Sequence, residues 1–278
     1  MDIEETMKKN QKQILIIIIA IVAILVLLKI FIFGGVRLNK PESVAFDPVG
    51  NRFLISNVGS GSIVAMDENG KFHKYMPKAF EAPKGLFLRD DMLYVTDPTK
   101  IHVVDVREAK IMDTYEIEGA VGLNDIAIDE NGLLYITDMG GDCVYIYDPA
   151  AKTQYKVLNP LLKAPNGIVY DRPRWQMFIV NNAERSPILS LDIRDRKLSI
   201  FMDSVYSNLD GIAIDDPGRI FISSWNEEMI VQIPQEQNRF IAYQEGIKGA
   251  ADMYYHLPTN ELIVPLLTSN KIQRIKLD

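Results

Sequence analysis

Residues that could bind a metal ion or a small ligand recur at the start of six similar segments of the sequence. The first position of these segments holds, in chain order, Glu42, Lys84, Asn124, Asn166, Asp210 and Ala251. The second position holds Ser43, Gly85, Asp125, Gly167, Gly211 and Asp252. If the segments converge, their carboxylates repel one another unless a proton or a cation lies among them. Carboxylate and amide oxygens are typical ligands of Ca²⁺, whereas Zn²⁺ prefers His and Cys. The pattern therefore favours a divalent cation such as Ca²⁺ where the segments meet.

An internal ion pair is the main alternative to a bound cation. Lys84 could pair with Glu42 and Asp210 and occupy the same space with its ammonium group. Asn, Asp and Gly are also common in turns that precede strands, so one such residue alone says little. The convergence of the six segments would turn them into a site, and it depends on the elements that contain them.

The elements that contain these residues repeat along the chain. The segments begin at positions 42, 84, 124, 166, 210 and 251, a spacing of 40 to 44 residues. Each is followed by a turn and by runs rich in β-branched and aromatic residues, such as 134–137 and 144–147; the first five repeats have a further run, as at 110–116. Four short strands per repeat are typical of a propeller blade. The sequence therefore predicts an all-β, six-bladed β-propeller whose innermost strands line a central channel.

The sixth repeat has three predicted strands, because the sequence ends at Asp278. An open sheet edge invites pairing with other chains, so we expect another segment to cover it. Residues 35–38 precede the first repeat and are available. We predict that the propeller spans residues 35–278 and that the N-terminal strand 35–38 closes the ring as the outer strand of the last blade.

The N-terminal segment differs in kind from the repeats. Residues 14–33 are apolar except for Lys29, and about 20 helical residues span the hydrocarbon core of a bilayer. No small-residue cleavage site follows, so we predict a retained, single-pass transmembrane anchor helix over 14–33, after a short polar tail over 1–13. The N-terminus is expected in the cytoplasm and the propeller on the exported side, whether periplasmic, extracellular or luminal. The short link predicts that the channel end with the first-position residues points away from the membrane.

Composition argues against several other function classes. The 278 residues have a formal net charge of -7 without a basic stripe, which excludes a nucleic-acid groove. Cys143 is the single cysteine, so the fold depends on its core and not on intrachain disulfides. No Ser-His-Asp order, Gly-rich phosphate loop or Cys/His metal spacing stands out.

Short motifs at the repeat starts resemble a known group of proteins. The phrases PESVAFD, GLNDIAID, APNGIVYD and LDGIAID look like the regucalcin and gluconolactonase group of six-bladed propellers, over roughly residues 41–278. The phrases APKGLFL, LYVTD, FISSW and AADMYYHLPTNELIVP resemble a bacterial branch of that group that is usually exported and has no established reaction. NHL-repeat and strictosidine-synthase-like propellers are more distant relatives.

The resemblance implies a metal site. In the gluconolactonase members a Glu, an Asn and an Asp bind one divalent metal; the matching residues here are Glu42, Asn166 and Asp210. Asn124 and Asp125 match an Asn-Asp pair that contacts substrate. This sequence departs from the group where Gly122 replaces an Arg, where Lys84 places a cation near the metal, and where Ala251 is apolar. The metal residues are thus retained, and the sugar-lactone contacts are not.

Three functions follow as hypotheses. The first is a membrane-anchored binding or scaffolding module that holds a small ligand or a protein partner at the first-position end of its channel, with Lys84, Asn124 and Trp225 as ligand contacts. The alternative is a Ca²⁺-type metal-dependent lactonase or esterase, with Asp125 or Asp252 as general base. The third is a structural subunit of a membrane complex.

Overall fold

The protein is described by a computed structural model of residues 12–25 and 35–278. Its contacts divide the chain into two units, Met1–Arg37 and Leu38–Asp278. In the first unit, residues 12–25 are helical. None of the helical structure in the described ranges combines the length and apolar character that a membrane span requires. The predicted tail 1–13 and anchor 14–33 both extend into residues outside those ranges, so the anchor and the orientation derived from it stay predictions.

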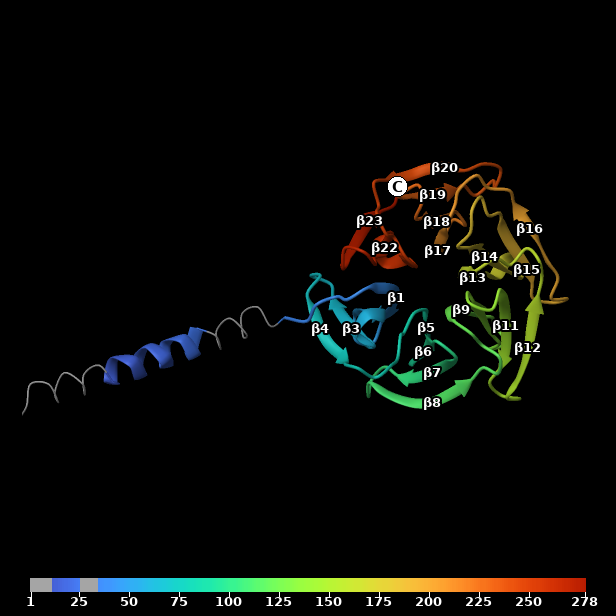
Figure 1. Cartoon of the computed structure of the whole chain (residues 1–278). Helices are drawn as coiled ribbons and strands as arrows, with labels where there is room; N and C mark the ends of the chain where they lie inside the picture. Colours follow the sequence, from blue (N-terminus) through green and yellow to red (C-terminus); the bar gives the residue numbers. More distant parts are fainter. Residues whose placement is uncertain (1–11, 26–34) are drawn as a thin grey trace, which may run out of the picture. The chain divides into compact units, whose positions relative to one another are not determined.

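The second unit is a ring of six antiparallel sheets (Figure 1). The first two blades consist of β1 (Pro41–Asp47), β2 (Arg52–Asn57), β3 (Ser62–Asp67) and β4 (Phe72–Met76), then β5 (Leu86–Arg89), β6 (Met92–Asp97), β7 (Lys100–Asp105) and β8 (Lys110–Glu116). The next two consist of β9 (Leu123–Ile128), β10 (Leu134–Asp138), β11 (Cys143–Asp148) and β12 (Thr153–Leu158), then β13 (Pro165–Asp171), β14 (Gln176–Asn181), β15 (Ile188–Asp192) and β16 (Leu198–Met202). The last two consist of β17 (Leu209–Ile214), β18 (Ile220–Ser224), β19 (Met229–Ile233) and β20 (Ile241–Glu245), then β21 (Tyr254–His256), β22 (Glu261–Leu266) and β23 (Lys271–Lys276).

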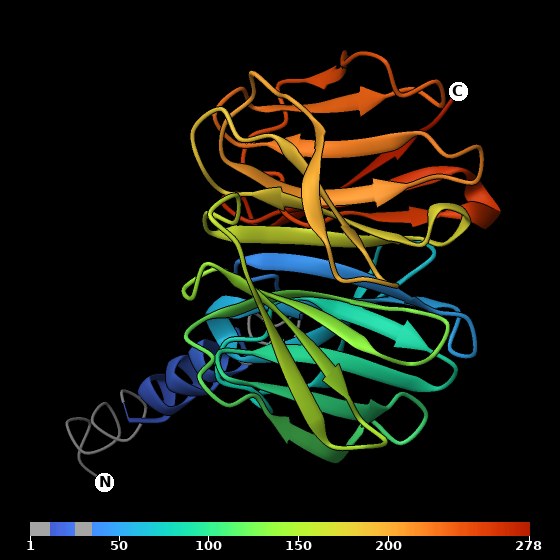
Figure 2. The same ribbon diagram turned by 90° about the vertical axis from the view of Figure 1, so that its right-hand side faces the viewer.

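Strands follow the chain order from the axis outward in every blade. The first strand of each blade lies next to the axis, and the strands run from one face of the ring toward the other (Figure 2). The predicted all-β, six-bladed propeller is therefore confirmed, and the second and third predicted runs of each repeat lie within strands of the expected order.

Burial explains why the strands differ in sequence pattern. All six residues of β9 are buried, whereas β12, at the outside of the same blade, is exposed except for Val157. An inner strand is covered on both faces by neighbouring blades and reads as a continuous apolar run, while an outer strand meets solvent. The apolar runs at the repeat starts thus follow from their place beside the axis.

The hydrophobic core lies between neighbouring blades. One cluster joins Ala127 and Val144 of the third blade to Ile168, Ile179 and Leu189 of the fourth, and similar clusters join the other consecutive blades. Because each blade packs its faces on its two neighbours, the ring itself fixes the positions of the six innermost strands.

The predicted closing strand is wrong. Residues 35–38 have no strand structure, and the sixth blade has the three strands β21, β22 and β23. The reason lies in the loop after β2, because Val58 and Gly59 donate their N–H groups to the carbonyls of Lys40 and Asn39. These bonds hold the entering chain against the first blade, and Lys40 then turns into β1 with a positive φ of 53°.

Aromatic packing and hydrogen bonds join the last blade to the first instead. The ring of His256 lies 4.4 Å from Phe46 and 5.0 Å from Phe53, measured between centroids. The N–H of Lys40 donates to Oδ1 of Asn270 (2.7 Å), and the N–H of Asp252 donates to the carbonyl of Glu42 (3.0 Å). Ring closure therefore takes place near the axis and not through an added outer strand.

Candidate functional site

The six first-position residues lie at one end of the channel, which we call the axial mouth. Glu42, Asn124, Asn166 and Asp210 are each the second residue of an innermost strand, whereas Lys84 and Ala251 lie two and three residues before β5 and β21. The four polar side chains in strands are almost fully buried, with exposed fractions of 2–6%. The structure therefore places the predicted metal residues Glu42, Asn166 and Asp210 at equivalent positions in three blades, as the repeat alignment predicts.

Four buried oxygens of the axial mouth accept no hydrogen bond from any residue that the structure describes. Asn166 donates its Nδ2 to Oδ2 of Asp210 (3.1 Å), and Asn124 points its Nδ2 at the sulfur of Met139 (3.5 Å). Among the described residues, no donor reaches the following atoms: Glu42 Oε2, Asn124 Oδ1, Asn166 Oδ1 and Asp210 Oδ1. Buried acceptors are rarely left unpaired, because each costs about 1–3 kcal/mol.

Burial of these carboxyls raises their pKa values. The pKa of Glu42 lies well above its ordinary value, because of desolvation first and the nearby Asp210 charge second. The pKa of Asp210 rises from 3.8 to about 7, again through desolvation first and then through repulsion by Asp252. The ionised forms are thus unfavourable without a compensating positive charge.

Lys84 supplies only part of that charge. Its ammonium group lowers the pKa of both Glu42 and Asp210, although in both cases burial has the larger, opposite effect. Within the described ranges Lys84 forms no ion pair with either carboxylate, and its side chain is partly exposed. In the described structure, the internal ion pair that competes with a cation in the sequence-based prediction is therefore not formed.

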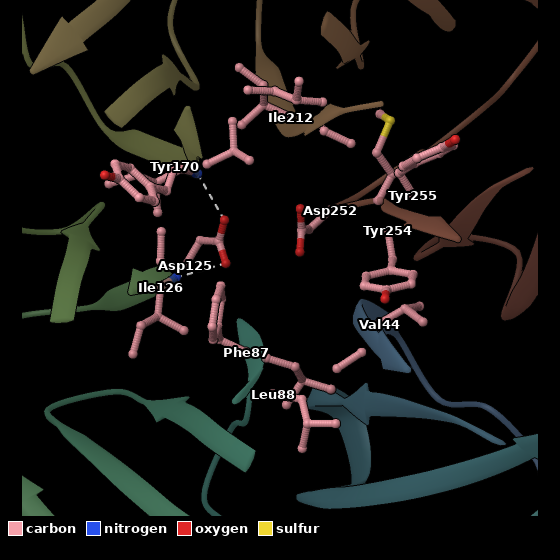
Figure 3. A pocket seen from close by; sticks show the side chains of 18 of the residues that line it. Val44, Phe87, Leu88, Asp125, Ile126, Tyr170, Ile212, Asp252, Tyr254 and Tyr255 are labelled. Carbon is pink, nitrogen blue, oxygen red and sulfur yellow. Dashed lines mark hydrogen bonds between the residues drawn. The ribbon is translucent and has the colours of Figure 1, made fainter. Parts of the chain in front are cut away.

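The second-position residues form an inner tier one step further along the strands. Asp125 and Asp252 belong to this tier and point toward each other across the channel (Figure 3). Oδ1 of Asp125 accepts the N–H of Ile126 (2.7 Å), and Oδ2 accepts the N–H of Ile168 from the next blade (2.8 Å). Oδ2 of Asp252 accepts the hydroxyl of Ser43 (2.6 Å).

The inner tier is also electrostatically strained. Burial raises the pKa of Asp252 from 3.8 to about 7. Burial and the charge of Asp252 raise the pKa of Asp125, against the two backbone N–H groups that lower it. The two residues predicted as general bases are therefore close together, but Asp125 has both oxygens bonded to the backbone. Asp252 is hydrogen-bonded by the Ser43 hydroxyl and by the N–H of Met253.

Hydroxyl groups of the second strands hold the inner tier in place. Thr137 accepts the N–H of Asp125 (2.9 Å) and donates to the carbonyl of Asn166 in the next blade (2.6 Å). Thr96 makes the same two bonds to Gly85 and Asn124, and Ser223 makes them to Gly211 and Ala251. These positioning residues were not predicted, although a Ser or Thr recurs at the same place in several second strands.

Glycines of the inner tier allow the blades to approach. A Cβ at Gly211 would lie 2.5 Å from the Cα of Asp252, and one at Gly85 would lie 2.6 Å from the Cα of Asp125. Since these neighbours are backbone atoms, they cannot yield as a flexible side chain would. Glycine is thus required at Gly85 and Gly211, where a side chain would meet the backbone of the following blade.

The predicted ligand contact Trp225 directly follows β18. Its backbone N–H donates to the carbonyl of Asn208 (3.1 Å), and its indole Nε1 is buried without an acceptor in the described structure. The other two predicted contacts, Lys84 and Asn124, belong to the axial mouth itself.

The oxygen atoms of the axial mouth are suitable ligands for a hard cation. In the described residues, no three His, Cys, Asp or Glu side chains group closely enough to hold a metal by themselves. The carboxylates of Glu42 and Asp210 and the amide oxygens of Asn124 and Asn166 still provide a set of ligand atoms that are all oxygens. Such a set suits Ca²⁺ and not Zn²⁺.

A protein-family model, described as SMP-30/Gluconolactonase/LRE-like region, matches residues 40–251. The chain belongs to this family. The match includes every residue of the axial mouth of this SMP-30/gluconolactonase-like propeller, and Asp252 lies one residue beyond it. No curated protein matches the sequence.

Solved structures with the same fold have different functions. A gluconolactonase from Xanthomonas campestris is 13% identical, covers 88% of either chain and superposes with a TM-score of 0.74. A virginiamycin B lyase from Staphylococcus aureus is 14% identical over 87% of either chain, with a TM-score of 0.63. A chain of a nidogen/laminin complex is 16% identical over 81% of this chain and 93% of its own, with a TM-score of 0.66. At these identities the likeness shows the fold of the SMP-30/gluconolactonase-like propeller and no more.

Proposed function

We propose that this protein is a membrane-anchored, exported propeller that binds a divalent cation, and with it a small oxygen-rich ligand or a loop of a partner protein, at the axial mouth. The observation that supports the proposal best is the set of four buried oxygens without donors, contributed by the first, third, fourth and fifth blades. One cation among them would satisfy acceptors that no described group of the protein satisfies.

The cation would be held by Glu42, Asn166 and Asp210. The bond from Asn166 to Asp210 uses one oxygen of the carboxylate and leaves the amide oxygen and the second carboxylate oxygen available. Both carboxyls have raised pKa values because they are buried without sufficient positive charge. A divalent ion would favour their ionised forms, so bound Ca²⁺ would offset the desolvation free energy of the two buried carboxylates.

The ligand would meet Lys84 and Asn124 at the edge of the same site. The ammonium group of Lys84 has no ion-pair partner in the described residues, and it is partly exposed. A carboxylate or a hydroxyl-rich ligand would offer it one. Trp225, whose buried Nε1 meets no acceptor in the part of the chain that the structure describes, is the third proposed contact. The predicted anchor over residues 14–33 would keep this binding activity at a membrane surface.

Hydrolysis of a lactone or a related ester is the second candidate function. Membership of the SMP-30/gluconolactonase-like family favours it, as does the pKa of about 7 of Asp252, which is suited to a general base near neutral pH. A divalent ion at Glu42, Asn166 and Asp210 would supply Lewis acidity toward a carbonyl oxygen. Asp252 would accept the proton of the attacking water, and Asp125 would hold the adjoining backbone through its two N–H bonds.

Calorimetry with Ca²⁺ on the detergent-solubilised full chain tests the cation site. The wild type should bind one equivalent, and Asp210→Ala should bind at least tenfold more weakly. Asp148→Ala, which removes a carboxylate from the last residue of β11, is the matched control and should bind as the wild type does. Absence of binding to the wild type at millimolar Ca²⁺ would refute the proposal.

The two candidate functions are then separated by turnover. A panel of lactones and aryl esters should be hydrolysed by the calcium-loaded wild type and not by Asp210→Ala if the protein is an enzyme. Ca²⁺ binding without turnover favours the binding module. The idea of a structural subunit of a membrane complex predicts instead that stoichiometric partners co-purify with both proteins after solubilisation.

A further inference from the structure

A cavity of about 350 Å³ occupies the channel beyond the inner tier. In each of the six repeat segments the axial-mouth residue comes first, the inner-tier residue second, and the residues that line the cavity third to fifth. The described lining includes Asp125 and Asp252 but no residue of the axial mouth. The cavity therefore lies on the far side of the inner tier, separate from the proposed cation site.

The side chains along the cavity walls are mostly aliphatic or aromatic, and their size differs from blade to blade. The fourth position of the six innermost strands holds Ala45, Phe87, Ala127, Val169, Ala213 and Tyr254, all of which line the cavity. The rings of Phe87 and Tyr254 reach into the channel from two blades (Figure 3), while the small residues of the other blades leave the space open. The result is a chamber with aliphatic and aromatic walls, in which Tyr170 lies across the channel from Tyr254 (Figure 3).

Two carboxyl groups close the inner end of this chamber. Asp125 and Asp252 are 4% and 8% exposed and face each other across the channel (Figure 3). In the described structure no Lys, Arg or His lines the cavity. Any ionised carboxylate at this end is therefore without a cationic partner on the cavity side, which attracts a positive ligand and repels a negative one.

We propose that the cavity binds a small organic ammonium ion with an apolar body. The ammonium group would lie between Asp125 and Asp252, where the electrostatic attraction is strongest. The adjoining rings of Phe87 and Tyr254 would stabilise the same charge through their π faces, and the aliphatic walls would cover the body. The volume is at the lower end of the range for ligand pockets, which restricts the body to about one ring.

This site differs from the axial mouth in ligand and in residues. A bare inorganic cation would satisfy the carboxylates but would leave the apolar walls unfilled. A neutral aromatic compound would pack against the walls but would not neutralise the charge of the carboxylates. Tight binding should therefore require both the ammonium group and the apolar body of the ligand, and probes that lack one of them test this directly.

The test uses phenethylammonium as probe, with 2-phenylethanol as its neutral counterpart and phenylacetate as its anionic one. In calorimetry on the detergent-solubilised full chain, phenethylammonium should bind at least tenfold more tightly than 2-phenylethanol, and phenylacetate should not bind. Equal binding of the charged and neutral probes would overturn the proposal. Displacement of phenethylammonium by an equal concentration of K⁺ or Ca²⁺ would do so as well, because it would identify an inorganic cation site.

Two variants locate the binding. Asp252→Asn should lower the affinity for phenethylammonium at least tenfold, to that for 2-phenylethanol. Asp113→Asn, the same change on an exposed position of β8, should leave the affinities for both probes unchanged. Because Asp252 also bonds to Ser43, a second variant avoids dependence on that contact. Tyr254→Leu should weaken the ammonium probe three- to tenfold. Wild-type binding in both variants, with native circular dichroism spectra, would contradict the assignment to this cavity.

Discussion

Asn166 donates its side-chain amide to Oδ2 of Asp210 across 3.1 Å, and each of the two residues keeps one buried oxygen without a donor. The bond joins the fourth blade to the fifth and fixes the direction of both side chains. It holds a carboxamide and a carboxylate in the positions that the proposed cation site requires.

Acid conditions should stabilise the cation-free protein through Asp210. Its pKa is about 7 in the folded state against 3.8 as the ordinary value, so the folded state binds more protons between these limits. The free energy of unfolding should therefore fall as pH rises from about 4 to about 7, by up to about 4 kcal/mol from this group. Urea unfolding in a chelator at several pH values measures the effect.

The variant Asp210→Asn isolates this contribution. Surface carboxyls such as Asp192, whose pKa is lowered to about 2 by Arg194, act in the opposite direction and are common to both proteins. As pH rises, the free energy of unfolding of the wild type should fall relative to that of Asp210→Asn. A difference that does not change with pH would show that Asp210 titrates normally.

Removal of the Lys84 charge should strengthen calcium binding. The ammonium group lowers the pKa of Glu42 and Asp210 through its charge, and so it partly replaces the effect of a bound cation. With Lys84→Met we expect the affinity for Ca²⁺ to rise three- to tenfold, since a repelling charge is lost. Lys110→Met, on the exposed first residue of β8, serves as control. Weaker binding in Lys84→Met would mean that the amine supports the site and does not compete with the ion.

Loss of the Thr137 hydroxyl should weaken the ring at the joint between the third and fourth blades. Thr137→Val leaves the N–H of Asp125 and the carbonyl of Asn166 without the partner they share. We expect a loss of about 1–3 kcal/mol in the free energy of unfolding. The exposed Thr153→Val in β12 should change stability by less than about 0.5 kcal/mol. Similar values for the two variants in urea unfolding would contradict a role for the hydroxyl.

A methyl group at Gly211 should be harmful, because its Cβ would lie 2.5 Å from the Cα of Asp252 and 2.6 Å from the carbonyl oxygen of Ala251. Gly211→Ala is expected to cost at least about 2 kcal/mol in thermal or urea unfolding. Gly122→Ala is the matched control, since its nearest neighbour would lie 3.5 Å away, an ordinary contact. If both variants unfold alike, the blades are less tightly apposed at the inner tier than the structure has them.

The repeat allowed much of the fold and the site to be predicted. The spacing of the six segments indicated six blades, and the apolar runs after Glu42 and Asn166 indicated innermost strands; both features are local in sequence. The partners of Lys40 and Thr137 were not predictable in the same way. They lie in other loops or blades, and no local pattern states which carbonyl or N–H group they meet. The predicted strand at residues 35–38 was wrong for this reason.

The cavity had no local signal either. Its volume arises because Ala127, Val169 and Ala213 are small at the same height of three blades, while Phe87 and Tyr254 are large at that height in two others. Each of these residues is ordinary in a strand. Only their arrangement around one axis produces a cavity with two carboxyls at its end.

Glu42 takes part both in the proposed cation site and in the bond that closes the ring, because its backbone carbonyl accepts the N–H of Asp252. These residues belong to the first and last blades, so more than 200 residues of chain separate the two halves of the joint. During synthesis the first blade can form long before its partner leaves the ribosome. The axial mouth is therefore completed last, and a chain that stops before the sixth blade has neither a closed ring nor a place to hold the ion.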